Sequence, residues 1–228
     1  MKLHSMVLAC LLLSAEARAA AILNVQFGNQ NGTAYTGAAV VGTAGDYWNF
    51  LNHGNGTNVA LEDSASDATS MTLTWQGGDA TAPFDYGFEF TAYADLMAGY
   101  LYNTSLQVMN VDGLTPDTSY DLYIYTQGDS ASDGREIQVS VNGGSDYSTG
   151  PTVSSASTFI LGQNYLDIAV TSDGSGQLSI ATTPTLEADI NGFQLVQTDS
   201  ATPEPSTLGL LAAGLAGMVW LKRRVPAR

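Results

Sequence analysis

The side chains able to do chemistry in this 228-residue chain are mainly aromatic and acidic. Trp48 stands beside Asn49, and Trp75 precedes a glutamine and two glycines. Aromatic rings stack on the apolar faces of sugars while amides bind the hydroxyls, so Trp48, Asn49 and Trp75 are candidate ligand-binding residues. Both tryptophans also fit strand patterns, in which aromatic residues more often fill the core. Because Trp48 follows a glycine-rich loop, we expect it to bind ligand, and we expect Trp75 to pack with Met71 and Leu73.

Sets of residues that could act together in catalysis are harder to find in this sequence. A serine hydrolase needs a histidine to accept the nucleophile's proton, and His53 is the only histidine after residue 20. Glycoside hydrolysis needs only two carboxylates about 5 to 10 Å apart, and several glutamates are available. These are Glu62, Glu89, Glu136 and Glu187. Availability alone is weak evidence among so many acids, so we expect no catalytic residues and keep a polysaccharide-active enzyme as the alternative.

An acidic segment at residues 129–136 offers a second kind of site. Asp129, Asp133 and Glu136 supply oxygen ligands of the type that calcium prefers. The segment lacks the complete twelve-residue calcium-loop pattern, and a solvated hairpin tip partly neutralised by Arg135 is the simpler interpretation. We therefore expect no cofactor, with a structural calcium ion at these three residues as the alternative.

Charge is distributed unevenly along the chain. Of its 22 acids and seven bases, 19 acids but only one base, Arg135, lie between residues 20 and 198, which gives this span a net charge of about −18. Nucleic acid is excluded as a partner, because phosphates must be met by Lys or Arg. Such acidity is typical of proteins that stay soluble in a salty or crowded exterior, and cation binding is the alternative explanation.

The N-terminus has the organisation of an export signal. Lys2 precedes an apolar segment at residues 6–13, and Ala17, Arg18 and Ala19 place small residues at the spacing that a signal peptidase recognises. The apolar segment is too short to remain as a membrane span. We predict a signal peptide over residues 1–20. Its removal takes away Cys10, the only cysteine, and with it any disulfide or thiolate site.

Between residues 21 and 198 the sequence is a succession of short strands and turns. Alternating apolar and polar residues predict strands, most clearly at residues 71–75 and 120–125. About eleven strands at intervals of roughly 8 to 15 residues are typical of a β-sandwich. The less regular segments are predicted as strands at 84–90 and 158–161, a turn at 53–56 and a single helical turn within 95–102.

Two motifs resemble parts of known folds. Residues 114–120 resemble the tyrosine corner of fibronectin type III domains, although the flanking segments are too long for seven strands. With residues 120–125 in mid-domain and 188–195 as the closing strand, the body resembles the galactose-binding-like and carbohydrate-binding jelly-roll β-sandwiches. The resemblance implies an all-β fold: a single jelly-roll-like β-sandwich over residues 21–198, between the signal peptide and a short C-terminal hydrophobic helix.

The C-terminus combines a proline-flanked triplet, an apolar run and a basic stop. The run at residues 208–221 has no polar side chain, and it is shorter than the about 20 residues of a stable membrane span. A transient anchor is therefore expected. The three parts, in this order, resemble the PEP-CTERM sorting signal of bacterial envelope proteins. They consist of Pro203, Glu204 and Pro205, residues 208–221, and Lys222, Arg223 and Arg224.

The sorting resemblance implies a destination for the chain. Residues 199–228 would form the sorting and anchor segment, with Pro203, Glu204 and Pro205 recognised by an exosortase-type enzyme. The implied course is export, anchoring by a transmembrane helix in the inner membrane, and transfer to the cell surface or extracellular matrix. We expect a non-catalytic envelope or matrix protein that binds exopolysaccharide. A secreted polysaccharide-active enzyme and a purely structural matrix protein are the alternatives.

Overall fold

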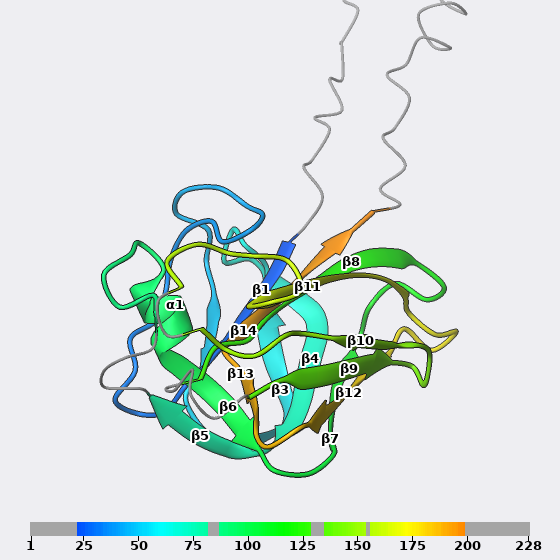
Figure 1. The fold of residues 1–228 in the computed structure, drawn as a ribbon. Helices are drawn as coiled ribbons and strands as arrows, with labels where there is room; N and C mark the ends of the chain where they lie inside the picture. The colour runs from blue at the N-terminus through cyan, green and yellow to red at the C-terminus, as the bar shows by residue number, and fades with distance from the viewer. Residues whose placement is uncertain (1–21, 82–86, 129–134, 154–155, 199–228) are drawn as a thin grey trace, which may run out of the picture. The chain divides into compact units, whose positions relative to one another are not determined.

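The structure is a computed structural model that describes residues 22–81, 87–128, 135–153 and 156–198. These residues belong to one compact unit. Within the described ranges the fold contains 14 strands and one short helix, α1 (Ala94–Ala98) (Figure 1). The predicted all-β class is confirmed. The predicted signal peptide and C-terminal helix lie outside the described residues.

The strands form two large sheets and one small one. The first sheet has the order β11-β8-β14-β1-β2, with bounds Tyr165–Thr171, Ser119–Tyr125, Gly192–Gln197, Ile22–Phe27 and Asn49–Leu51. The second has the order β10-β9-β12-β7-β4-β3, with bounds Asp146–Ser148, Ile137–Val141, Leu178–Pro184, Gln107–Asp112, Ala68–Gln76 and Asn55–Glu62. The third has the order β13-β6-β5, with bounds Ala188–Ile190, Gly99–Asn103 and Gly78–Thr81.

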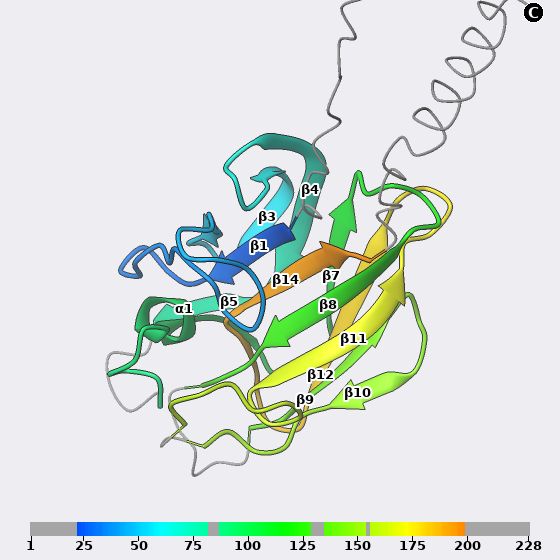
Figure 2. The same ribbon diagram turned by 90° about the horizontal axis from the view of Figure 1, so that it is seen from above.

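The chain passes back and forth between the two large sheets. From β7 onward, the chain alternates between the two large sheets. The six-stranded sheet contains β7, β9 and β12, and the five-stranded sheet contains β8, β11 and β14, which follow them in turn. Neighbouring strands are antiparallel except for the parallel pair β1 and β2. Figure 2 shows the five-stranded sheet in front of the six-stranded one. This alternation is the jelly-roll arrangement expected from the sequence.

The core lies between the two sheets because every second side chain of each strand points inward. Leu122 and Ile124 of β8 belong to the same buried cluster as Met109 and Val111 of β7. Burial of each such side chain contributes about 1.5 to 3 kcal/mol. The remaining side chains of β7 and β8 point away from this core in opposite directions. The sandwich therefore has two separate outer faces.

The tyrosine corner predicted from residues 114–120 is present. The buried Tyr120 hydroxyl accepts a hydrogen bond from the backbone N–H of Thr115 at 3.2 Å, five residues earlier. Residues 113–118 carry the chain from β7 in one sheet to β8 in the other. The bond fixes this crossing at the start of β8.

The strand predicted at residues 84–90 is wrong over 87–90, and its first part is not described. Residues 87–90 form a bend and a turn, with Phe88 buried and Phe90 93% exposed. The strand predicted at 158–161 is also wrong. There the Asn164 side chain accepts from the Ile160 N–H at 2.8 Å and donates to the Thr158 carbonyl at 3.0 Å. The Asn164 side chain thus makes the backbone hydrogen bonds that a neighbouring strand would otherwise supply.

The turn predicted at residues 53–56 ends earlier than expected, because β3 already begins at Asn55. A Cβ atom on Gly56 would collide with the Trp75 ring, so this glycine allows close strand packing. The predicted helical turn is correct only in its first part. Helix α1 ends at Ala98, and the chain continues directly as β6.

Candidate functional site

The outer face of the five-stranded sheet is partly covered by loops. The loop of residues 28–48, the segment around α1 and residues 156–161 contribute to a second aromatic cluster on this face. Its fully buried members include Tyr35, Trp48, Phe88 and Tyr125. Any ligand site on this side must therefore lie beyond the covering loops.

Trp48 lies inside the second aromatic cluster. Its side chain is 1% exposed, and its ring is 5.5 Å from that of Tyr35 and 6.2 Å from that of Tyr125. Its indole Nε1 donates to the Gly37 carbonyl at 2.9 Å. The expectation of an exposed Trp48 is therefore wrong. The glycine-rich loop before Trp48 folds back over the ring instead of presenting it to solvent.

Asn49 is also committed to the fold. Its Nδ2 donates to the carbonyls of Asn24 at 2.9 Å and Glu62 at 2.8 Å, while its Oδ1 accepts from the Glu62 N–H at 2.9 Å. The buried amide thus links β1 to β3. It has no accessible group left for a ligand, so Asn49 is a structural residue.

Trp75 belongs to the sandwich core, as expected from its place beside Met71 and Leu73. Its ring is 5% exposed and lies 6.2 Å from that of Phe27. Its Nε1 donates to the His53 carbonyl at 3.0 Å. The core interpretation of Trp75 is confirmed, and the ring has no free face for a sugar.

Four polar side chains on the covered face fix the loop of residues 28–48. The Tyr125 hydroxyl donates to Gln194 Oε1, and Gln194 Nε2 donates to Asn24 Oδ1 at 2.7 Å. Asn24 and Gln26 in turn donate to the carbonyls of Tyr47 at 2.8 Å and Thr33 at 2.9 Å. Burial raises the pKa of Tyr125 far above its usual range, so its hydroxyl stays protonated. This network is structural.

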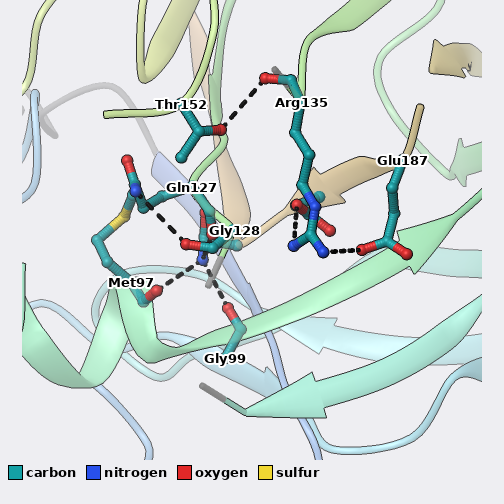
Figure 3. Close-up of polar contacts among 9 residues, drawn as sticks. Met97, Gly99, Gln127, Gly128, Arg135, Thr152 and Glu187 are labelled. Atoms are coloured by element: carbon teal, nitrogen blue, oxygen red, sulfur yellow. Dashed lines mark hydrogen bonds and ion pairs between the residues drawn. The ribbon is translucent and has the colours of Figure 1, made fainter. Parts of the chain in front are cut away.

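The single base of the body is held by two carboxylates (Figure 3). The Arg135 guanidinium lies 3.3 Å from Glu187 Oε1 and 3.3 Å from Asp189 Oδ2, and Asp189 is buried. Gly128 permits this packing, because a Cβ there would collide with Asp189 and Arg135. Breaking a buried ion pair leaves an uncompensated charge, so the guanidinium is fixed rather than available to an anionic ligand.

Asn191 connects three segments beside Arg135. Its Nδ2 donates to the carbonyls of Met97 at 2.8 Å, Gly99 at 2.8 Å and Gln127 at 3.1 Å (Figure 3). In the sequence, Asn191 is recognisable only as part of the motif at residues 188–195. Within the described residues, Asn191 Oδ1 and Gln127 Oε1 have no hydrogen-bond partner, but both side chains are fully buried. The cluster therefore holds the end of the sandwich together.

The expected calcium ligands are only partly described. Asp129 and Asp133 lie outside the described residues. Glu136 is half-buried next to Arg135, and its carbonyl accepts from the Thr185 N–H at 3.2 Å. Among the residues that the structure describes, no group of three His, Cys, Asp or Glu side chains is placed to hold a metal ion.

A half-exposed area remains on β8 and β11, where Tyr123 and Tyr165 pack against the margin of the second aromatic cluster. Strand alternation directs Asp121 and Tyr123 away from the core, as it does Tyr165 and Asp167 on the neighbouring strand. Tyr123 pairs with Asp167 across the two strands, and the Tyr165 ring stacks at 6.4 Å on the buried Tyr125. We call Asp121, Tyr123, Tyr165 and Asp167 the tyrosine–aspartate patch.

The side chains of the tyrosine–aspartate patch are available to a ligand. Within the described residues, none of the four makes a side-chain hydrogen bond or ion pair. Burial, and then the charge of Asp121, raise the pKa of Asp167. Burial and the nearby Asp167, Asp121 and Tyr165 raise the pKa of Tyr123. At neutral pH the patch therefore presents a protonated tyrosine donor beside carboxylate acceptors.

The C-terminal end of the chain carries a recognisable sequence motif. Residues 201–224 match the family model of the PEP-CTERM protein-sorting motif. The chain carries this sorting motif. The PEP-CTERM motif marks an exported protein that an exosortase recognises and that is anchored in the membrane before processing. Within the described residues no helix is long and apolar enough to cross a membrane, and the predicted anchor lies outside them.

The sandwich resembles several solved structures at low sequence identity. The match to Bacteroides uniformis β-glucuronidase has 17% identity and a TM-score of 0.51, and it covers 77% of this chain and 18% of that one. A CBM35 domain from Cellvibrio japonicus matches with 16% identity, a TM-score of 0.32 and coverages of 79% and 88%. The ANXUR2 extracellular domain from Arabidopsis thaliana matches with 15% identity, a TM-score of 0.40 and coverages of 60% and 44%. A comparison with curated proteins found no match.

These likenesses concern the fold alone. The chain spans less than a fifth of the glucuronidase, so that enzyme's activity does not transfer to it. Any function of the sandwich must be argued from its own surface.

Proposed function

We propose that the protein is an exported, exosortase-sorted envelope or matrix protein whose sandwich binds exopolysaccharide at the tyrosine–aspartate patch. The observation that carries this proposal is the pairing of two half-exposed rings, Tyr123 and Tyr165, with two carboxylates that have no partner among the described residues. Tyrosine rings offer stacking surfaces for sugars, and carboxylates accept hydrogen bonds from sugar hydroxyls. Both strands belong to a rigid sheet, which favours precise positioning.

The charge of the body favours a neutral glycan. Residues 20–198 carry about 18 negative charges, and their only base, Arg135, is paired with Glu187 and Asp189. An anionic polysaccharide would meet repulsion at the patch without a cation to offset it. We therefore expect neutral glycans to bind and uronate-rich polymers to be rejected.

A glycosidase is the second candidate, and one observation favours it. The pKa of Asp167 is raised beside Asp121, and an acid with a raised pKa near a second carboxylate is what glycoside hydrolysis requires. Two of the glutamates considered from sequence are already engaged, since Glu187 pairs with Arg135 and Glu62 accepts from the Ser66 hydroxyl at 2.6 Å. Release of reducing sugar from a bound glycan, abolished by Asp167→Asn, would favour the enzyme.

The binding proposal is tested with the full chain in a detergent that contains no sugar. A glycan array identifies the best neutral ligand, and calorimetry then compares wild type with Tyr123→Ala and Tyr165→Ala. Loss of a stacking ring should weaken binding about tenfold, equivalent to about 1.4 kcal/mol. Tyr147→Ala is the matched control, because Tyr147 is 40% exposed on β10, a strand of the six-stranded sheet that contains no patch residue. No glycan binding, or equal affinities for all three variants, would contradict the proposal.

A further inference from the structure

The outer face of the six-stranded sheet is uncharged although the body is strongly acidic. Strands β4, β9 and β12 contain no charged residue. The acids of the other three strands are Glu62, Asp112 and Asp146, each at the first or last position of its strand. Two of these strands, β3 and β10, are the edges of the sheet. The middle of this face is therefore free of the charge that the rest of the domain carries.

The outward side chains of neighbouring strands line up in rows across this face, one row being polar and the next mainly apolar. Their outward direction follows from strand alternation, since the intervening residues, including Met109, Val111, Val139 and Ile180, are buried in the core. Cross-strand pairing joins Thr74 to Asn110 and Asn110 to Ser179, and joins Val108 to Ala181 and Ala181 to Ser140. All six side chains are half-exposed or exposed. Neighbouring residues within a row are about 4.8 Å apart, which is the spacing between strands. Successive rows are about 6.8 Å apart along the strands.

Several of these polar side chains are free to bind an external partner. Within the described residues, the side chains of Asn110, Ser140, Ser179 and Thr183 make no hydrogen bond to the protein. Water satisfies them in the free protein, and a polymer with hydroxyls at a matching repeat can replace that water. Val108, which is 43% exposed, adds an apolar contact in the same area.

We propose that this uncharged face is a second glycan-binding surface, which adsorbs a neutral, ordered polysaccharide. A regular array of outward hydroxyls and amides can meet many sugar hydroxyls, each contact being weak and the number of contacts large. A uronate polymer is disfavoured by the acids that surround the face. A second copy of this chain is disfavoured because two bodies of about −18 charge repel each other.

The proposed surface is distinct from the tyrosine–aspartate patch. Asn110 and Ser179 point away from the core on one side of the sandwich, whereas Tyr123 and Asp167 point away from it on the other. A substitution can thus remove glycan binding at one surface while the other surface still binds, so each proposal has its own test.

The test is a pull-down of the full chain on microcrystalline cellulose, in the same sugar-free detergent. Ala181→Lys places a long side chain in the middle of the face, and Ala44→Lys makes the same change of charge on an exposed turn between β1 and β2. We expect wild type, Ala44→Lys and the Tyr123→Ala/Tyr165→Ala double variant to bind alike. We expect Ala181→Lys to bind at least tenfold more weakly.

A second variant guards against misfolding of Ala181→Lys. Asn110→Ala/Thr183→Ala removes two hydrogen-bonding groups without adding bulk, and it should also weaken cellulose binding while its melting temperature stays near that of wild type. The proposal is overturned if wild type does not bind cellulose, if both face variants bind as well as Ala44→Lys, or if alginate competes for the same surface. Loss of cellulose binding in the double tyrosine variant would also overturn it.

Discussion

Tyr123 and Tyr125 lie two residues apart on the same face of β8, yet their environments differ. Tyr125 is covered by the loop of residues 28–48, where its hydroxyl donates to Gln194 and accepts from the Val40 N–H at 3.1 Å. Tyr123 lies at the margin of that cover, and its hydroxyl has no partner among the described residues. The covering loop, rather than the residue type, distinguishes the structural Tyr125 from the candidate ligand-binding Tyr123.

Desolvation of the Asp167 carboxyl, and then its repulsion from Asp121, should be measurable as a pH-dependent loss of stability. The pKa of Asp167 is higher in the folded state than in the unfolded chain, so the unfolded chain loses this proton first as the pH rises. Stability should therefore fall as the pH rises from the ordinary range of an aspartate through the raised folded pKa. Asp167→Asn removes this effect and should raise the unfolding free energy at pH 7 by about 0.3 kcal/mol, because Asp167 is exposed and solvent screens its charge.

Chemical denaturation at several pH values checks this prediction. Asp146→Asn is the control, because it removes the same net charge from the exposed edge strand β10. The gain of Asp167→Asn should disappear below about pH 3, where this aspartate is protonated in both the folded and the unfolded state. Equal gains for the two variants at pH 7 would assign the effect to net charge instead.

The sequence could indicate part of the patch but not all of it. Strand alternation at residues 120–125 predicts that Asp121 and Tyr123 share a face. Tyr165 and Asp167 come some 40 residues later, and only the β8 to β11 register brings them alongside. Trp48 was misjudged because a glycine-rich stretch predicts a loop without indicating whether that loop folds back over the next residue.

At the scale of elements, side-chain amides make hydrogen bonds to backbone groups that a neighbouring strand would otherwise bind. Asn164 binds the backbone of residues 158–160, and Asn49 binds that of Glu62. Apolar residues at 158–161 therefore gave a strand pattern in a segment whose backbone needs no neighbouring strand. Strands with strict alternation of apolar and polar residues, such as β4 and β8, were predicted well because their period alone specifies the inward face.

The tyrosine corner gives an element-scale prediction. Tyr120→Phe removes the hydroxyl that accepts from the Thr115 N–H, and the other ring atoms keep their packing. The unfolding free energy should fall by about 1 kcal/mol, the usual net value of one hydrogen bond. Urea denaturation of wild type and variant measures this, with an unchanged slope showing that the compactness of both states is preserved.

Tyr147→Phe is the matched control for the corner, since the Tyr147 hydroxyl lies on an exposed edge strand without a protein partner among the described residues. It should leave stability unchanged. If the two substitutions had the same effect, the Tyr120 bond would contribute nothing and the loop of residues 113–118 would be fixed by packing alone.

At the scale of the whole molecule, the sorting motif predicts how the chain is released. Pro203→Ala/Pro205→Ala alters the recognition triplet without touching the apolar run at 208–221. In a host with an exosortase, wild type should be released without its tail, and the variant should stay in the membrane fraction. Mass spectrometry of the released protein checks this, with Ala44→Lys on an exposed turn of the body as the control. Released protein with an intact C-terminus would contradict the prediction.

The two proposed surfaces on opposite sides of one sandwich predict that a single molecule can join two polysaccharides. Binding at one face leaves the other free, so a soluble neutral glycan held at the tyrosine–aspartate patch should be carried onto cellulose held at the uncharged face. Labelled glycan should sediment with cellulose only when wild-type protein is present. Tyr123→Ala and Ala181→Lys should each reduce this about tenfold, and mixing the two variants should not restore it, because neither variant carries both intact surfaces. Restoration by the mixture would mean that copies associate, and the bridging unit would then be an oligomer rather than one chain.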